Sequence, residues 1–139
     1  GTDAADFAAH GLTVPAGTLF AGRVTDEQMR ALMEDALCFA MPSLTEGFGL
    51  PPLEAMMLGC PALLAPCGAL PEVCGDAALY ADPRDPGAWT AGIRRLRDEP
   101  GLRDRMVVAG RAQSERFTWD AAGRRLIEII ARFAAPGAA

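Results

Sequence analysis

Hydrophobic positions along the chain alternate between short unbroken runs and stretches with helical spacing. Three apolar runs, at 37–41, 62–65 and 78–80, have the length of strands. Unbroken apolar runs of this kind are typical of parallel sheets whose strands are covered on both faces. A fourth run at 18–21 ends at Gly22 and predicts one more strand.

Helical spacing fills the segments between and after these runs. The expected helices cover residues 26–36, 51–58, 70–74, a stretch beginning at 85, 101–116 and a stretch beginning at 118. In the last helix we expect four apolar side chains to be buried, namely Leu126, Ile127, Ile130 and Phe133. Residues 1–17 are expected to hold the end of a helix and a loop, and residues from 134 onward a loose tail. Strands alternating with helices predict a Rossmann-like α/β fold, an open parallel sheet with flanking helices, in one domain over 1–139.

The charged residues exclude several classes of protein. The net charge is −5, and all 13 basic residues are arginine. The absence of lysine excludes a Schiff-base enzyme and a Walker P-loop, both of which need that residue. An acidic chain is a poor general binder of nucleic acid. The arginine-rich segment from Arg94 onward is interpreted as solvated helix faces, so any membrane contact is expected to be peripheral only.

Cysteine and histidine do not form the patterns of a metal centre. Cys38, Cys60, Cys67 and Cys74 contain no C-x-x-C pair, and His10 is the only histidine. We therefore expect no metal and no cofactor. Buried, reduced thiols are the simplest interpretation of the cysteines, and they fit a cytoplasmic protein.

The segment 42–56 is the most informative part of the sequence. It follows an expected strand and opens an expected helix, and ligands of open parallel sheets bind beyond the carboxyl ends of the strands. A helix start presents free N–H groups and favours phosphate. Pro51 and Pro52 have no N–H group, so the main-chain donors expected for an anion are those of Gly47, Phe48, Gly49 and Leu50, with Leu53 beyond them.

Two acids, Glu46 and Glu54, bracket this expected phosphate cradle. A carboxylate accepts hydrogen bonds well from a vicinal diol, so the pair is suited to hold a hydroxylated group on each side of a phosphate. That pattern describes a nucleotide-sugar. Taken without their neighbours, the two acids are better explained as solvated surface residues.

The neighbours of the two acids resemble a known family. Glu46, seven residues and Glu54, within E-G-F-G-L-P-P-L-E-A-M, resemble the signature of family-four retaining glycosyltransferases of the GT-B fold. Further segments resemble family motifs in the same order: 20–24, 39–43, 59–63, 68–73, 75–78, 82–86 and 117–119. The resemblance covers about residues 6–133.

The resemblance implies a role for each candidate residue. Glu54 is expected to hold the ribose hydroxyls of a nucleotide-sugar donor, and Glu46 to contact the donor sugar near its reacting face as the candidate catalytic residue. Gly49 and Leu50 are expected to donate main-chain N–H groups to the diphosphate. Arg23 and Val24 are expected to lie against the base. The family uses no metal and transfers the sugar with retention, usually by a front-face mechanism.

Departures from the family pattern limit what the resemblance implies for this chain alone. The family's donor domain carries an arginine and a lysine for the diphosphate, and this sequence has no lysine. The family's N-terminal acceptor domain has no counterpart here. We therefore expect this chain to be the nucleotide-sugar-binding part of a retaining glycosyltransferase and to be inactive alone. Its expected partner is the missing N-terminal domain or a second copy of the chain in a homodimer. The alternative is a catalytically inactive binding or assembly module with the same fold.

Overall fold

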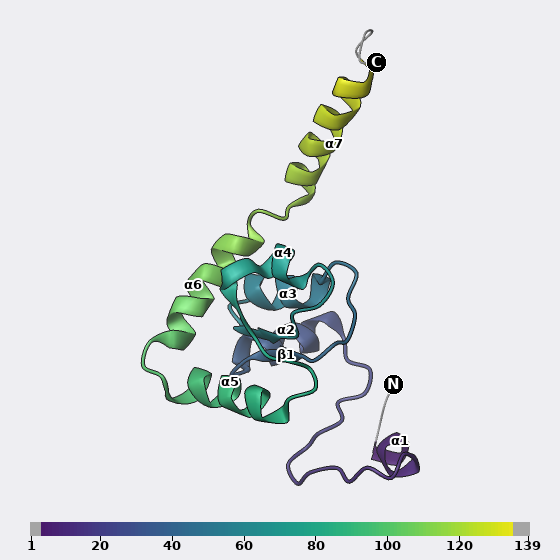
Figure 1. Ribbon diagram of the computed structural model, residues 1–139, viewed down its shortest axis with the longest axis vertical. Coiled ribbons are helices and arrows are strands. Elements are labelled where there is room, and N and C mark those ends of the chain that lie inside the picture. Colours follow the sequence, from purple (N-terminus) through teal and green to yellow (C-terminus); the bar gives the residue numbers. More distant parts are fainter. Residues whose placement is uncertain (1–3, 135–139) are drawn as a thin grey trace. The chain divides into compact units, whose positions relative to one another are not determined.

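The chain divides into two compact units, Gly1–Leu32 and Met33–Ala139, each described here by itself. Within them the structure, a computed structural model, describes residues 4–134, so residues 135–139 of the tail expected from 134 onward lie outside the described residues. Figure 1 shows the order of the elements along the chain. The expectation of a single domain stays a prediction.

The first unit holds the short helix α1 (Ala4–Ala9) and most of α2 (Asp26–Asp35). The predicted start of α2 is confirmed, because Thr25 and Gln28 form a reciprocal capping box: the Thr25 amide donates to Gln28 Oε1 at 2.9 Å, and the Gln28 amide donates to Thr25 Oγ1 at 3.3 Å. The strand predicted at 18–21 is wrong. That segment pairs with no described strand, and a strand forms only where a neighbour accepts and donates its backbone hydrogen bonds.

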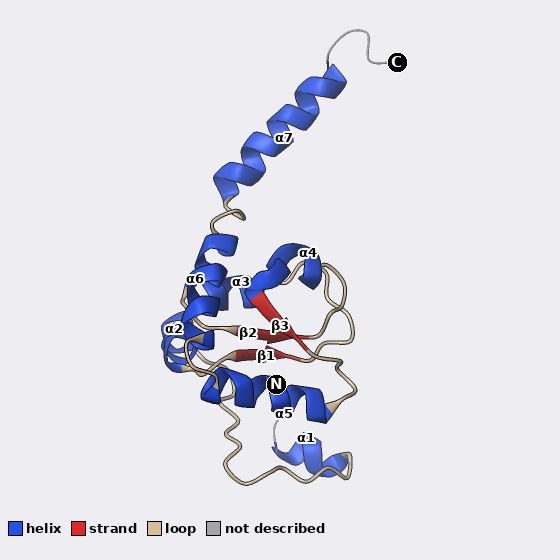
Figure 2. Cartoon of the chain, turned by 60° about the vertical axis from the view of Figure 1, so that its left-hand side comes forward, coloured by secondary structure: helices blue, strands red, loops and turns tan. Residues whose placement is uncertain are grey.

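The second unit is built on a parallel sheet with the order β1 (Phe39–Met41), β2 (Ala62–Leu64) and β3 (Ala78–Tyr80). In the register, Phe39 lies beside Ala62, and Ala62 lies beside Ala78. Figure 2 shows the three strands side by side with helices on both faces. The predicted α/β class and these three strands are confirmed.

Helices cover the two faces of this sheet, as Figures 1 and 2 both show. On one face, α3 (Leu50–Met57) and α4 (Leu70–Cys74) enclose the main core, which includes the side chain of Leu64. On the other face, α5 (Pro86–Asp98) lies over Leu63, so close that a side chain on Gly92 would come within 2.9 Å of Leu63 Cδ1. All of β2 is therefore buried. For β1 the expectation of cover on both faces is wrong, because Ala40 is exposed.

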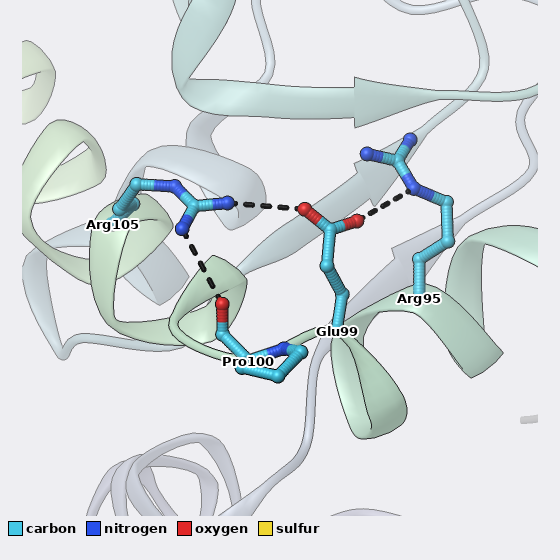
Figure 3. A network of polar contacts seen from close by, with 4 residues as sticks. All are labelled: Arg95, Glu99, Pro100 and Arg105. Carbon is cyan, nitrogen blue, oxygen red and sulfur yellow. Dashed lines mark hydrogen bonds and ion pairs between the residues drawn. The ribbon is translucent and has the colours of Figure 1, made fainter.

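The helices α5 and α6 (Leu102–Ser114) are joined by a turn that a single acid braces. Glu99 accepts from Arg95 Nε at 3.2 Å and from Arg105 Nη2 at 3.0 Å, and Arg105 also donates to the carbonyl of Pro100 at 3.4 Å (Figure 3). This network links the end of one helix to the start of the next. A short 3₁₀ helix, η1 (Gly75–Ala77), lies between α4 and β3.

The last helix, α7 (Trp119–Ala134), starts where it was predicted to start. Thr118 caps it, since its hydroxyl accepts from the Ala121 amide at 3.1 Å. The expected burial of its apolar face is wrong: the exposed fractions are 58% for Leu126, 68% for Ile127, 56% for Ile130 and 82% for Phe133. An amphipathic pattern identifies the face, but no described part of the chain covers it. No described helix combines the length and the apolar content that a membrane span requires.

Candidate functional site

The candidate site is the loop of residues 42–49, which leaves the carboxyl end of β1 and enters α3. Gly49 is the N-cap of α3, with φ of +96°, and no side chain caps the helix. The next three residues are Leu50, Pro51 and Pro52, so the first turn of α3 offers only one amide, that of Leu50. This arrangement leaves the positive end of the helix dipole open for an anion.

The backbone amides of the loop differ in whether they are already hydrogen-bonded. Within the described part of the chain, no group accepts from the N–H of Phe48, Gly49 or Leu50. The Gly47 amide donates to Glu46 Oε1 at 3.1 Å. The expectation that Leu53 supplies a further donor is wrong, because its amide bonds to the carbonyl of Gly49 at 3.4 Å as the first hydrogen bond of the helix.

Gly49 fixes the start of α3 against the core. A Cβ at this position would lie 2.5 Å from Leu70 Cδ2, and Leu70 is completely buried in α4. The positive φ and this close approach both require glycine. The free amides at the helix start are therefore held by the packing of α3 on α4.

The two candidate acids flank Leu50 by four residues on either side. Glu46 is half-buried in the loop, and Glu54 is exposed on α3. Residues four apart lie on one helix face, and helical side chains lean toward the N-terminus. The Glu54 carboxylate therefore stands on the same face as Leu50, in the direction of the open helix start.

The remaining candidates, Arg23 and Val24, belong to the first unit, whereas the loop and both acids belong to the second. Arg23 is exposed and Val24 is half-buried. The structure thus brings the main-chain donors and Glu54 onto one helix start, and it leaves the predicted base contacts of Arg23 and Val24 as predictions.

Sequence reasoning missed the residues from other parts of the chain that contact the loop. Cys67 Sγ donates to the carbonyl of Ser43 at 3.2 Å, and Gly68 lies directly against the backbone of Glu46. Phe48 meets Phe117 edge-on, with ring centroids 6.0 Å apart. Gly68 was visible as part of a matching motif, but nothing in its local pattern indicates which distant residue it contacts.

Comparisons with known proteins identify the family of this chain. The profile of the family described as "Glycosyl transferases group 1" matches residues 3–113. The chain is 42% identical over 101 residues to the O-antigen chain mannosyltransferase B of Escherichia coli, covering 73% of this chain and 26% of that protein. It is 38% identical over 120 residues to the MMP alpha-(1->4)-mannosyltransferase of Mycolicibacterium hassiacum, covering 81% of this chain and 29% of that protein.

Among solved structures, the sucrose-phosphate synthase of Thermosynechococcus elongatus superimposes with a TM-score of 0.73. The match covers 83% of this chain and 30% of that one at 24% sequence identity, and it confirms the expected GT-B-type fold. The chain thus spans less than a third of the length of these relatives. On the strength of the profile match and of the two mannosyltransferases, the chain belongs to the group 1 glycosyl transferases.

Proposed function

We propose that this chain is the nucleotide-sugar-binding part of a retaining glycosyltransferase that transfers a sugar from a nucleoside-diphosphate sugar to an acceptor hydroxyl. The observation that carries the proposal is the start of α3, where the amides of Phe48, Gly49 and Leu50 have no acceptor among the described residues. The two relatives described above are named mannosyltransferases, and their names support mannose as the transferred sugar.

Each residue of the site has a distinct part in this proposal. The amides of Phe48, Gly49 and Leu50 hold the diphosphate and, together with the helix dipole, stabilise the charge that develops on it as the sugar leaves. Glu54 accepts hydrogen bonds from the two ribose hydroxyls. Glu46 contacts the sugar, and no metal ion takes part.

The chemistry proposed is a front-face displacement. The bond between the anomeric carbon and the diphosphate oxygen breaks, and the bond to the acceptor oxygen forms on the same face of the sugar. The acceptor proton passes to the departing diphosphate oxygen, so that the configuration at the anomeric carbon is retained. Because the leaving group takes the proton, the site needs no separate general base.

The acceptor site is proposed to lie outside these residues, since the relatives are more than three times as long as the matched region. On this proposal the 139-residue chain binds the donor but transfers no sugar by itself. The base contacts remain assigned to Arg23 and Val24. A reducing compartment such as the cytoplasm is proposed as the location, because the four cysteines are all free thiols.

The alternative function, an assembly module, is favoured by the apolar face of α7. We propose a second copy of the chain as its occupant. An antiparallel pair of α7 helices centred on Leu126 would place Trp119 of one copy opposite Phe133 of the other, the self-complementarity that a two-fold interface requires. Trp119 is 92% exposed, so pairing would remove a large apolar surface from water.

The test of the main function is a calorimetric titration of this chain with GDP-mannose, UDP-glucose and ADP-glucose, and with the matching nucleoside diphosphates. We expect one sugar nucleotide to bind with a dissociation constant below about 1 mM, equivalent to roughly −4 kcal/mol. We also expect it to bind more tightly than its own nucleoside diphosphate. Absence of binding by all three donors would overturn the proposed function.

A further inference from the structure

The turn between β2 and α4 supports the candidate loop at three points. The Cys67 thiol donates to the carbonyl of Ser43 at 3.2 Å. Gly68 lies against the backbone of Glu46, and Leu70 lies against Gly49. Residues three apart in the loop, at 43, 46 and 49, are therefore each in contact with this turn or with the first residue of α4.

The contact between Gly68 and Glu46 is the tightest of the three. A Cβ on Gly68 would overlap the carbonyl oxygen of Glu46, and it would lie 2.9 Å from the carbonyl carbon and 3.2 Å from the amide nitrogen. All of these are backbone atoms, which cannot turn aside as a flexible side chain can. Gly68 also has a φ of +53°, where a side chain is strained. Only glycine allows the two segments to lie this close.

The turn is held more firmly than the loop that it supports. The Ala65 amide continues the sheet by donating to the carbonyl of Met41 at 3.1 Å. Within the turn, the Cys67 amide donates to the carbonyl of Ala65 at 2.9 Å, and the Leu70 amide donates to the carbonyl of Cys67 at 3.1 Å. In the candidate loop, by contrast, Glu46 is held by the hydrogen bond between its own carboxylate and the amide of the next residue, Gly47. A group added at Gly68 therefore displaces Glu46 rather than the turn.

We propose that Gly68 is a positioning residue for Glu46. By lying directly against the backbone of Glu46, Gly68 determines the position of the Glu46 carboxylate. The proposal rests on the proposed function, in which that carboxylate contacts the donor sugar. Gly68 acts through Glu46 and does not itself touch the donor.

The first test uses the chain without any donor. Gly68→Ala is compared with Gly101→Ala, which also changes a glycine of positive φ (+73°) but meets only the flexible end of Arg105. In ¹H–¹⁵N spectra we expect Gly68→Ala to shift the amides of Glu46 and Gly47 most strongly, and Gly101→Ala to leave them in place. Unshifted Glu46 and Gly47 amides in a folded Gly68→Ala chain would overturn the proposal whether or not the chain binds a donor.

The second test separates positioning from a general effect on structure. The ratio of the affinity for GDP-mannose to the affinity for GDP measures what the sugar adds to binding. We expect Gly68→Ala to lower this ratio by about tenfold, as loss of a hydrogen bond to a charged group would. Adding Glu46→Gln to Gly68→Ala should lower the ratio no further, since both changes remove the same contact.

Two outcomes distinguish this inference from the proposed function. An equal loss of affinity for GDP-mannose and GDP would contradict the positioning role while leaving donor binding intact. Failure of the unaltered chain to bind any donor would overturn the proposed function, whereas the amide test above would still decide the role of Gly68. Should Gly68→Ala fail to fold, Gly68→Asn carries the same Cβ with less strain at positive φ. Unfolding of both variants would show that Gly68 is needed for folding and would contradict the proposal.

Discussion

The Gly47 amide donates a 3.1 Å hydrogen bond to the carboxylate of its neighbour Glu46. This bond satisfies both groups in the absence of a ligand. In the proposed function the Glu46 carboxylate turns to a sugar hydroxyl, and this would release the Gly47 amide to a phosphate oxygen. The proposed function therefore links contact with the sugar to the number of donors offered to the diphosphate, through one pair of residues.

This relationship predicts a selective effect of Glu46→Gln. The variant should weaken binding of the sugar nucleotide by about tenfold or more and change the affinity for the free nucleoside diphosphate little, because the hydrogen bond that it loses is to the sugar. Calorimetric titration with GDP-mannose and GDP provides the two values. Equal losses for both ligands would place Glu46 on the nucleotide rather than on the sugar.

Glu54→Gln should give the complementary pattern. A hydrogen bond to a charged group contributes roughly 1.5–3 kcal/mol. Loss of the ribose contact should therefore weaken the binding of the sugar nucleotide and of the free nucleoside diphosphate alike, by about tenfold or more. Glu115→Gln, at an exposed residue just after α6, is the matched control and should leave both affinities unchanged. An affinity unaltered in Glu54→Gln would remove this residue from the site.

The support of α4 predicts a stability effect at Tyr80. The Tyr80 hydroxyl donates to the carbonyl of Gly75 at 3.0 Å and lies 3.2 Å from that of Leu70, so it joins β3 to both ends of α4. Tyr80→Phe should lower the free energy of unfolding by roughly 1–3 kcal/mol, the cost of leaving a carbonyl without its partner. Denaturant titration measures this change. Thr90→Val removes a hydroxyl from the exposed face of α5 and should cost clearly less.

Tyr80 also predicts how stability depends on alkaline pH. Burial, with smaller contributions from the charges of Cys74 and Asp76, raises the pKa of Tyr80 from its ordinary value of 10.0 to about 12. Because the pKa is raised in the folded state, the contribution of the Tyr80 hydroxyl to stability is fully present below pH 10 and is lost as the pH rises toward 12. In this interval Tyr80→Phe should lose less stability than the unaltered chain. Equal losses of stability in the two proteins would show that Tyr80 does not titrate with unfolding.

The strands and the helix starts were predictable because their signals are local. The unbroken apolar runs at 62–65 and 78–80 predicted strands of a parallel sheet, and β2 and β3 lie there. Asp85 is the N-cap of α5, accepting from the Gly87 and Ala88 amides, as its position before Pro86 indicated. Each of these features depends on residues close together in the sequence.

The features that sequence reasoning missed depend on partners far along the chain. The run at 18–21 is apolar enough for a strand, but no described strand lies beside it. The periodicity of α7 identified an apolar face around Leu126 without showing what covers it. The contact of Gly68 with Glu46 joins two loops that no local pattern connects.

The exposed face of α7 predicts self-association. In sedimentation experiments at high protein concentration, the 14.6 kDa chain should show about twice its own mass, because pairing buries the apolar residues of α7. Leu126→Asp should return the chain to a monomer. Ala131→Asp, on the polar stripe of the same helix, should leave association intact. A monomer at every concentration would contradict a second copy as the occupant of this face.

The most direct measurement of donor binding is a titration of the ¹⁵N-labelled chain with GDP-mannose, UDP-glucose and ADP-glucose, followed amide by amide. If the start of α3 grips the diphosphate, the amides of Phe48, Gly49 and Leu50 should shift more than any others, and Gly47 should shift with them as Glu46 turns to the sugar. If these amides stay in place at saturating concentrations of every donor, the start of α3 is not the diphosphate site.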